Sequence, residues 1–334
     1  MIDTVSLRAF ARHRRLRSTL ALRDLFRETR LHPADLVAPV FVTDATDLAV
    51  DAESLPGLRR HHVDSVVDAV AAVTETGVRA VLLFGVPGRK DDVGSGAWAA
   101  DGVVPRAIRA VRDARIDVSI FADVCLCQYT THGHCGLVAD GRILNDTTLE
   151  AIGKASVAYA AAGASVVAPS GMMDGSVATI RHALDGAGLA HVGILAYTVK
   201  HASALYGPFR DAARSSPVAG DRRSHQLDPA NANEALREAA ADVAEGADVL
   251  MVKPALTNLD TLVRLRQAHP GTPLAAYEVS GEYAMVRAAA ARGWLSEREA
   301  ALEALVAIKR AGADLIVTYR AVEAARWIRD GGSP

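Results

Sequence analysis

Cysteine is almost absent from this chain, which has three cysteines in 334 residues. An odd number without a secretory context argues against a disulfide framework, and a reducing compartment is the default, so we expect a cytoplasmic protein. All three thiols fall between positions 125 and 135, as Cys125, Cys127 and Cys135. Buried structural cysteines scatter along a chain, so this clustering indicates a shared task.

Long apolar runs and an excess of charge are also missing. No apolar run approaches the roughly 18 residues that span a bilayer, and none follows the basic start of the chain, so we expect neither a membrane span nor a signal peptide. A net charge of −2 provides no field that would attract nucleic acid or an anionic membrane. Half of the residues are hydrophobic, which is enough for a large globular core.

Lysine is scarce. Of the 37 basic residues only five are lysines: Lys90, Lys154, Lys200, Lys253 and Lys309. Nearly all of the other positions that carry a positive charge have arginine. Only lysine offers an amine that can lose its proton and attack a carbonyl, so a lysine in an apolar setting is a candidate nucleophile.

Eight short apolar runs alternate with Ala-rich helical stretches. The runs lie at 36–42, 79–85, 117–124, 164–170, 191–200, 248–253, 273–280 and 314–320. Runs that are apolar on both faces and alternate with helices predict a parallel sheet covered by helices. Eight of them predict a (β/α)₈ TIM barrel over residues 36–334. A doubly wound open sheet is the alternative, disfavoured because no run is followed by a G-x-G-x-x-G turn.

Two segments fall outside this alternation. Residues 1–35 are polar and Arg-rich, and we interpret them as an extended N-terminal arm for subunit assembly rather than for nucleic-acid binding. Residues 206–226 form a long loop with four arginines: Arg210, Arg214, Arg222 and Arg223. We interpret this loop as an active-site lid whose arginines capture a carboxylate or phosphate, with a solvated Arg-rich loop as the alternative.

A barrel places its chemistry at the carboxyl ends of its strands. The predicted ends hold Asp123, Ser170, Lys200, Lys253, Ser280 and Tyr319. The two lysines would end neighbouring strands, which lie about 4.8 Å apart. Partly desolvated amines at such range push the pKa of at least one of them down, which makes it a Schiff-base nucleophile. Lysines that snorkel to surface carboxylates are the alternative.

The cysteines lie on the loop after the third predicted strand with the spacing C-x-C-x₇-C. Three thiolates suit zinc, and three protein ligands with an open fourth position are typical of a catalytic zinc site. A fourth ligand, His132 or His134, would make the site structural. Unconnected buried thiols or a redox pair are the alternatives, although C-x-C is a poor redox spacing.

A series of long motifs follows in a fixed order along the chain: RETRL, DVCLCQYTTHGHCG, APSGMMDG, YGPFRDAA, GDRRSHQLDPAN, GADVLMVKP, VSGEYAM and KRAGADLIVTYRA. With these motifs the chain resembles the porphobilinogen synthase (5-aminolevulinate dehydratase) family over nearly its whole length. The resemblance implies a lyase that condenses two molecules of 5-aminolevulinate to porphobilinogen with loss of two waters, in tetrapyrrole (haem) biosynthesis. It also implies a homo-octamer whose N-terminal arms wrap a neighbouring subunit.

The resemblance further implies a role for each matching residue. Lys253 would form the Schiff base with the propionate-side substrate and Lys200 with the acetate-side substrate, with Asp123 beside the metal and the reacting amine. The cysteine triad would bind Zn²⁺. Carboxylates and the rest of the substrate would be held by Arg210, Arg222, Gln226, Ser280, Tyr319 and Ser170. Glu238 matches the position at which some members bind an allosteric Mg²⁺.

Six residues depart from the family's usual pattern: Val199, His201, His225, Asn258, Glu278 and Arg320. These departures keep two rival functions open. One is a paralogous Schiff-base lyase or aldolase-like enzyme that acts on a different amino ketone. The other is a non-catalytic zinc-binding relative, against which the two intact lysines argue.

Overall fold

The computed structural model describes residues 11–331 and divides the chain into two compact units, Met1–Arg30 and Leu31–Pro334. The first unit contains the 3₁₀ helix η1 (His13–Arg17) and the helix α1 (Leu20–Leu25), neither of which has a buried residue. The hydroxyl of Thr19 caps α1 by accepting a hydrogen bond from the Leu22 N–H at 3.2 Å. The first ten residues of the predicted arm lie outside the described residues.

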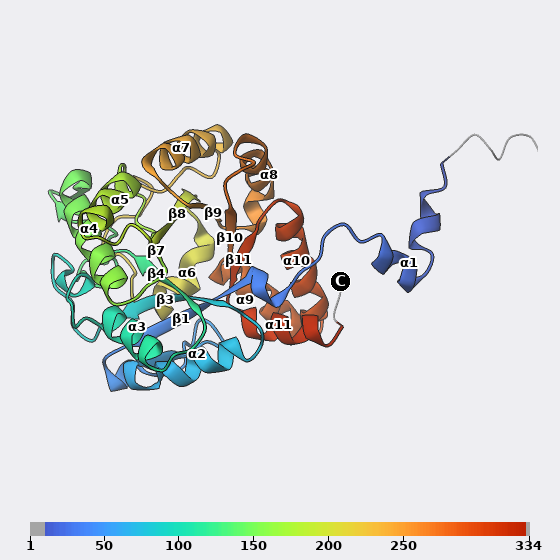
Figure 1. The fold of residues 1–334 in the computed structure, drawn as a ribbon, viewed down its shortest axis with the longest axis horizontal. Coiled ribbons are helices and arrows are strands. Elements are labelled where there is room, and N and C mark those ends of the chain that lie inside the picture. Colours follow the sequence, from blue (N-terminus) through green and yellow to red (C-terminus); the bar gives the residue numbers. More distant parts are fainter. Residues whose placement is uncertain (1–10, 332–334) are drawn as a thin grey trace, which may run out of the picture. The chain divides into compact units, whose positions relative to one another are not determined.

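Eight parallel strands close into a barrel in the second unit (Figure 1). They are β1 (Leu36–Thr43), β3 (Ala80–Val86), β4 (Ser119–Val124), β7 (Val166–Pro169), β8 (Gly193–Lys200), β9 (Val249–Lys253), β10 (Leu274–Glu278) and β11 (Leu315–Thr318). The ring closes because β11 pairs with β1 as well as with β10. Each strand coincides with one of the eight apolar runs, so the predicted (β/α)₈ TIM barrel is confirmed.

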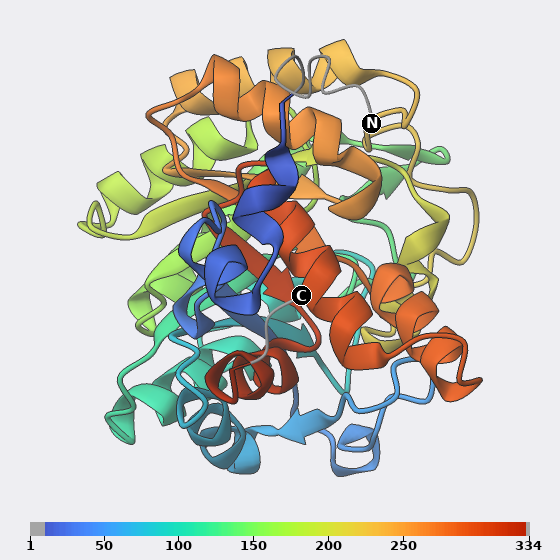
Figure 2. The same ribbon diagram turned by 90° about the vertical axis from the view of Figure 1, so that its right-hand side faces the viewer.

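Helices surround the barrel, apart from α6, which lies within the ring of strands in the view of Figure 1, and Figure 2 turns those of the C-terminal part, drawn in red, toward the viewer. They are α2 (Val66–Thr74), α3 (Val103–Asp113), α4 (Asn145–Ala161), α5 (Ser176–Gly186), α6 (Gly207–Ala212), α7 (Ala232–Glu245), α8 (Leu259–Ala268), α9 (Ser280–Ala291), α10 (Glu297–Arg310) and α11 (Ala321–Arg329). Gly246 ends α7 with φ of +103°, a conformation that glycine adopts without strain. Across residues 11–331, no helix combines the length and the apolar character needed to cross a bilayer.

Short strands and 3₁₀ turns lie between the main strands and helices. A short strand β2 (Arg60–His62) adds to the sheet beside β1, and β5 (Val138–Ala139) pairs with β6 (Arg142–Ile143) in an antiparallel hairpin. Further 3₁₀ turns are η2 (Pro33–Asp35), η3 (Thr46–Leu48), η4 (Val63–Ser65), η5 (Ser95–Ala97), η6 (Ala204–Tyr206) and η7 (Leu256–Asn258). The predicted arm ended at residue 35, whereas the second unit begins at Leu31. Pro33 is buried and Asp35 forms an ion pair with Lys309 of α10 at 3.1 Å, so these residues belong to the barrel unit.

The strands separate two hydrophobic cores. Along β1, Ala38 and Val40 pack with helix residues, whereas Val37 and Phe41 belong to the core inside the barrel. Phe41 stacks on Phe84 of β3, with ring centroids 5.1 Å apart. Because both faces of every barrel strand are buried, apolar residues occupy consecutive positions, which is the pattern read from the sequence.

Candidate active site

Lys200 and Lys253 end the neighbouring strands β8 and β9 and stand opposite each other in the strand register. The prediction that the two lysines share one edge of the barrel is therefore confirmed. The register of β8 shifts between Ala196 and Val199, as at a β-bulge. This shift turns Val199 to the outer core while Tyr197 remains inside. Such bulges re-aim side chains, and here both Tyr197 and Lys200 face the interior.

Aromatic rings surround the Lys253 amine. Its Nζ lies 4.2 Å from the ring centroid of Tyr277, 5.0 Å from Phe209, 5.1 Å from Tyr206 and 5.4 Å from Tyr197. Burial in this setting lowers the pKa of Lys253 well below its usual range, and the charge of Lys200 lowers it further. A lysine with a depressed pKa carries a larger fraction of neutral, nucleophilic amine.

Asp123, at the end of β4, is buried on the same edge of the barrel. The Gln128 amide donates to its Oδ2 at 3.1 Å, while Oδ1 has no hydrogen-bond partner within the described part of the chain. Burial raises the pKa of Asp123, and the hydroxyl of Ser170 and the charge of Lys200 oppose that rise. The Lys200 amine donates to the carbonyl of Ser170. One carboxylate, one hydroxyl and two amines are thereby gathered in one buried place.

The three cysteine thiols converge on one point. The Sγ atoms of Cys125, Cys127 and Cys135 all lie within 4.8 Å of one another, and all three residues are buried. In the described residues this is the only group of three or more His, Cys, Asp or Glu ligand atoms gathered so closely. Neither His132 nor His134 joins it, so the group has three ligand atoms, and the side chain of His225 lies beside Cys135. The alternative of unconnected thiols is therefore excluded by the geometry.

The thiols influence one another. Hydrogen bonds from Cys125 and Cys127 lower the pKa of Cys135 well below its ordinary value, whereas the contacts of Cys125 with Cys127 and Cys135 raise the pKa of Cys125. Burial by itself would lower the pKa of Arg222, but the neighbouring Cys135 and Cys127 raise it overall. The cluster therefore favours one thiolate, at Cys135, with the cation of Arg222 beside it, whereas the pKa of Cys127 is raised to about 11. A metal ion that binds all three sulfur atoms would have to displace the remaining protons.

The segment predicted as a long loop at 206–226 is partly helical, because it contains α6 and begins at the end of η6. It lies against the cysteine loop. The Val218 N–H donates to the His132 carbonyl at 3.1 Å, and His134 Nε2 lies 2.8 Å from the Ala219 carbonyl oxygen. Arg222 donates to the Gly133 carbonyl at 3.0 Å. Segments 85–89 residues apart in sequence thus form one cover beside the cysteines.

Several buried polar groups of this cover lack partners. No hydrogen bond from the described residues reaches the amide of Gln226, Nε of Arg210 or Nε of Arg222. Burial lowers the pKa of Arg210, and the nearby charge of Arg222 lowers it further. Two neighbouring guanidinium groups and an amide with unsatisfied donors are chemically suited to a carboxylate, which would supply the missing acceptors.

Ser280 and Tyr319 lie in different situations. The buried Ser280 hydroxyl donates to the Leu205 carbonyl and accepts from the Phe209 N–H, both at 3.0 Å, so it links the start of α9 to the lid segment. Tyr319 is only partly buried, and its hydroxyl accepts a hydrogen bond from Tyr277 at 3.0 Å. The Tyr319 hydroxyl can therefore still donate a hydrogen bond to a ligand. The Ser280 hydroxyl can do so only after its hydrogen bond to the Leu205 carbonyl breaks.

Glu238 lies on α7, half-buried, and lines a cavity of about 970 Å³ together with Gln226 and His225 of the lid. Burial and the charge of Asp174 raise the pKa of Glu238. On the same helix, burial raises the pKa of Asp242 to about 6. The cavity touches Tyr197 but not the two lysines, which are only 4–5% exposed.

The family-atypical residues are dispersed. Val199 packs in the outer core, His201 is buried and donates its N–H to the Lys253 carbonyl at 3.0 Å, and the Asn258 amide donates to the Pro254 carbonyl at 2.8 Å. Glu278 and Arg320 form an ion pair that is inaccessible to solvent. The sequence analysis did not predict this ion pair. Its signal was the occurrence of two opposite charges at the predicted ends of neighbouring strands, Glu278 shortly before Ser280 and Arg320 directly after Tyr319.

Comparison with known proteins agrees with this geometry. The family model described as delta-aminolevulinic acid dehydratase matches residues 10–327. A delta-aminolevulinic acid dehydratase of Halalkalibacterium halodurans is 50% identical over 321 residues, which cover 96% of this chain and 98% of that protein. The Bacillus subtilis protein of the same name is 48% identical and covers 96% of this chain and 99% of its own.

A solved structure is similar throughout. The crystal structure of delta-aminolevulinic acid dehydratase (porphobilinogen synthase) from Toxoplasma gondii, in complex with the reaction product porphobilinogen, superimposes with a TM-score of 0.94 at 44% identity. The match covers 97% of this chain and 94% of that one. With the barrel, the paired lysines and the cysteine cluster in place, this chain belongs to the delta-aminolevulinic acid dehydratase family of lyases.

Proposed function

We propose that this protein is a porphobilinogen synthase that condenses two molecules of 5-aminolevulinate through Schiff bases on Lys253 and Lys200. The observation that best supports this proposal is that two buried lysines stand opposite each other in the strand register, at the ends of β8 and β9. Structural lysines rarely stay buried unless paired with a carboxylate. Within the described residues neither amine forms an ion pair, and the buried carboxylate of Asp123 acts on both through its charge. Family membership supplies the substrate.

Lys253 acts as the principal nucleophile. Its neutral amine attacks the ketone carbon of one substrate, and the ketone oxygen leaves as water when the imine forms. The aromatic rings around Nζ bury the amine away from water, and this burial lowers its pKa. Lys200 forms the second imine in the same way, and its charge helps to depress the pKa of Lys253. Asp123, with its free Oδ1, is positioned to exchange protons with the reacting amine.

The cysteine triad fits a zinc ion. Three buried thiols within 4.8 Å of one another are the soft ligands that zinc prefers, and three ligands leave a position for substrate. When bound, zinc would polarise a substrate oxygen or hold the substrate amine. Arg222 beside the thiols, and Gln128, whose side-chain oxygen accepts from Cys127 at 3.4 Å, orient the cluster from the protein side.

The lid binds the substrate carboxylates. Arg210, Arg222 and Gln226 offer unsatisfied donors for the acetate-side carboxylate. Tyr319 and Ser280 serve the other carboxylate, with Ser280 exchanging its Leu205 contact for the ligand. Because the lysines are nearly inaccessible beneath the lid, substrate entry requires that the lid opens.

Two features concern regulation and assembly. We assign Glu238 as a ligand of an allosteric Mg²⁺, because the neighbouring charges of Asp174, Glu234 and Glu245 favour a cation beside its half-buried carboxylate, with waters or a second subunit completing the shell. The N-terminal unit exposes Leu16, Leu20 and Leu25 by 52%, 63% and 71%. Apolar residues exposed in this way support packing on another copy, in agreement with a homo-octamer.

The decisive experiment supplies 5-aminolevulinate as the sole substrate together with zinc, and detects the pyrrole. Borohydride reduction during turnover should attach substrate to the peptide that contains Lys253 and, secondarily, to that of Lys200. Label without pyrrole formation, obtained with another amino ketone, would favour the paralogous lyase. Label on Lys90, Lys154 or Lys309 would refute the assignment of the nucleophile.

A further inference from the structure

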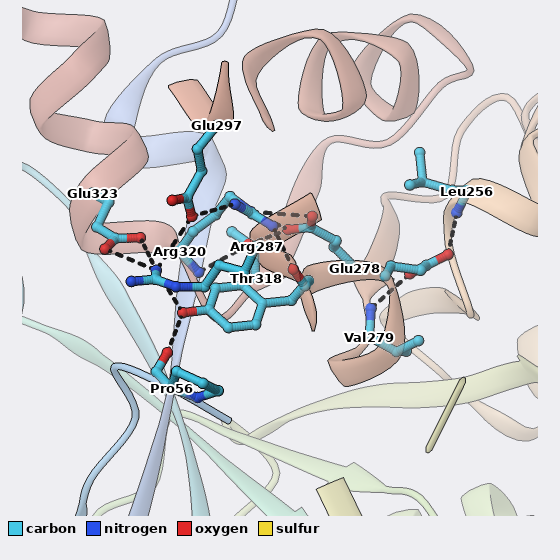
Figure 3. A network of polar contacts seen from close by, with 11 residues as sticks. Pro56, Leu256, Glu278, Val279, Arg287, Glu297, Thr318, Arg320 and Glu323 are labelled. Carbon is cyan, nitrogen blue, oxygen red and sulfur yellow. Dashed lines mark hydrogen bonds and ion pairs between the residues drawn. The ribbon is translucent and has the colours of Figure 1, made fainter. Parts of the chain in front are cut away.

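Among residues 11–331, Arg320 is the largest residue that is fully buried, and its charge is balanced by Glu278. Its Nε lies 3.2 Å from Oε1 and 3.3 Å from Oε2 of Glu278, and neither side chain is exposed to solvent. The Thr318 hydroxyl also donates to Glu278, and Thr318 Oγ1 accepts from the Arg320 N–H at 3.2 Å. Figure 3 shows these side chains directed toward one another. Desolvating two charges is costly, so such a pair needs good geometry to persist.

The guanidinium joins four structural elements. Arg320 directly follows β11, its Nε contacts Glu278 at the end of β10, and its Nη2 donates to the Tyr283 carbonyl of α9 at 3.2 Å. Its Nη1 lies 3.5 Å from Oε1 of Glu297 in the first turn of α10, an ion pair without a hydrogen bond. The planar fork of arginine can satisfy these partners together, whereas the point charge of lysine cannot. Arg320 therefore fixes the carboxyl ends of two adjacent strands relative to the helices that follow them.

These strand ends carry residues of the proposed site. Tyr319 directly precedes Arg320, and Tyr277 directly precedes Glu278. The Tyr277 hydroxyl donates to Tyr319 at 3.0 Å, and the Tyr277 ring lies under the Lys253 amine. The Arg320 guanidinium also lies 4.7 Å from the ring centroid of Tyr283, whose ring is 5.8 Å from that of Tyr319. Tyr319 is thus held from two sides by groups that the ion pair anchors.

We propose that the buried Arg320–Glu278 ion pair is a positioning element that aims the Tyr319 hydroxyl at a substrate carboxylate. The inference rests on the proposed function, because that function assigns Tyr319 to the carboxylate. The pair does not touch the substrate. It keeps the ends of β10 and β11 in one arrangement, and a hydroxyl displaced by about 1 Å loses most of a hydrogen bond's directional strength.

The test replaces the pair as a unit. Glu278→Gln with Arg320→Met removes both charges, which a buried site often tolerates, whereas Arg320→Met alone leaves Glu278 as an uncompensated buried charge and should destabilise the fold. Arg320→Lys is the second variant, since it retains a cation for Glu278 but lacks the fork. Thermal unfolding identifies the variants that fold, and pyrrole formation from 5-aminolevulinate by the unmodified protein tests the proposed function separately.

Two ketone probes report the position of Tyr319. The first is 4-oxopentanoate, which retains the carboxylate, and the second is 4-oxopentanamide, which lacks the charge. Half-saturation of borohydride labelling at Lys253 gives the affinity for each. The double variant should bind the carboxylate probe about tenfold more weakly and the amide probe unchanged, as for the loss of one charge-assisted hydrogen bond. Arg320→Lys should show the same loss in part.

The chain offers a matched control at the opposite end of the same two strands. Arg266 pairs with Asp314, whose Oδ2 accepts from the Leu274 N–H at 2.8 Å, so this pair joins the amino ends of β10 and β11. Arg266→Met should leave both probe affinities at the wild-type values.

Three results would overturn the proposal. One is a folded double variant that still discriminates the two probes as the wild type does, because the pair would then be structural only. Another is an equal loss of discrimination in Arg266→Met. If the unmodified protein forms no pyrrole and no label at Lys253, the proposed function fails, and the positioning role fails with it.

Discussion

Replacing Gly133 with alanine tests whether the lid and the cysteine loop act as one unit. Gly133 has φ of +72°, and a Cβ there would lie 2.3 Å from the Ser216 carbonyl oxygen of the lid. The two backbone segments must separate by roughly 1 Å to restore an ordinary van der Waals contact. Gly141, in the turn between β5 and β6, has the same φ of +72°, and its Cβ would meet no described atom within 4 Å. Gly141→Ala therefore carries the same backbone strain, about 1–2 kcal/mol, without the clash.

The expected magnitude follows from the hydrogen bonds that cross this contact. Arg222 donates to the Gly133 carbonyl at 3.0 Å, the Val218 N–H donates to the His132 carbonyl at 3.1 Å, and His134 Nε2 is 2.8 Å from the Ala219 carbonyl. A separation of roughly 1 Å weakens all three, and at about 0.5–1.5 kcal/mol each the net loss is about 3 kcal/mol. This corresponds to an increase of about 100-fold in the population of the open lid.

Hydrogen exchange at the Val218 amide measures that population directly. In Gly133→Ala this amide should exchange about 100-fold faster than in the wild type, whereas Gly141→Ala should leave its exchange unchanged. The Michaelis constant for 5-aminolevulinate should rise in the first variant only. Equal exchange of Val218 in the two variants would refute the coupling between the lid and the cysteine loop.

Three further predictions concern the metal, the nucleophile and a buried carboxylate. Cys125→Ala with Cys127→Ala should reduce zinc in the purified protein from a stoichiometric amount to none by metal analysis; retained zinc would contradict the triad. Lys253→Arg should lose both turnover and borohydride label, because a guanidinium stays protonated and forms no imine. Burial raises the pKa of Asp242 from 3.8 to about 6, so the folded state binds more protons than the unfolded state in this window and stability falls as the pH rises through it. Asp242→Asn should thus stabilise the metal-free protein against urea at about pH 8 and not at about pH 3; the same gain at both pH values would disprove this origin.

Much of the barrel and of the site was predictable from local sequence. Each apolar run became a strand because residues buried on both faces of a sheet must be apolar at every position, a constraint that short segments carry by themselves. Lys200 and Lys253 were predictable at one edge for the same reason, since each ends such a run. The cysteines lie within eleven residues, so their convergence required only one loop to fold back.

The remainder depended on contacts between distant segments. Glu278 and Arg320 are 42 residues apart, and the register shift in β8 depends on its pairing with β9. Ser280 was predicted at the end of a strand, whereas it is the first residue of α9 and its hydroxyl donates a hydrogen bond to the carbonyl of Leu205, 75 residues away. The sequence by itself determined which residues are buried in strands and which chemical groups follow them. Only the tertiary structure decided which of those groups come into contact. The partner of a buried charge or hydroxyl comes from a distant segment, and the spacing of residues along the chain does not identify that segment.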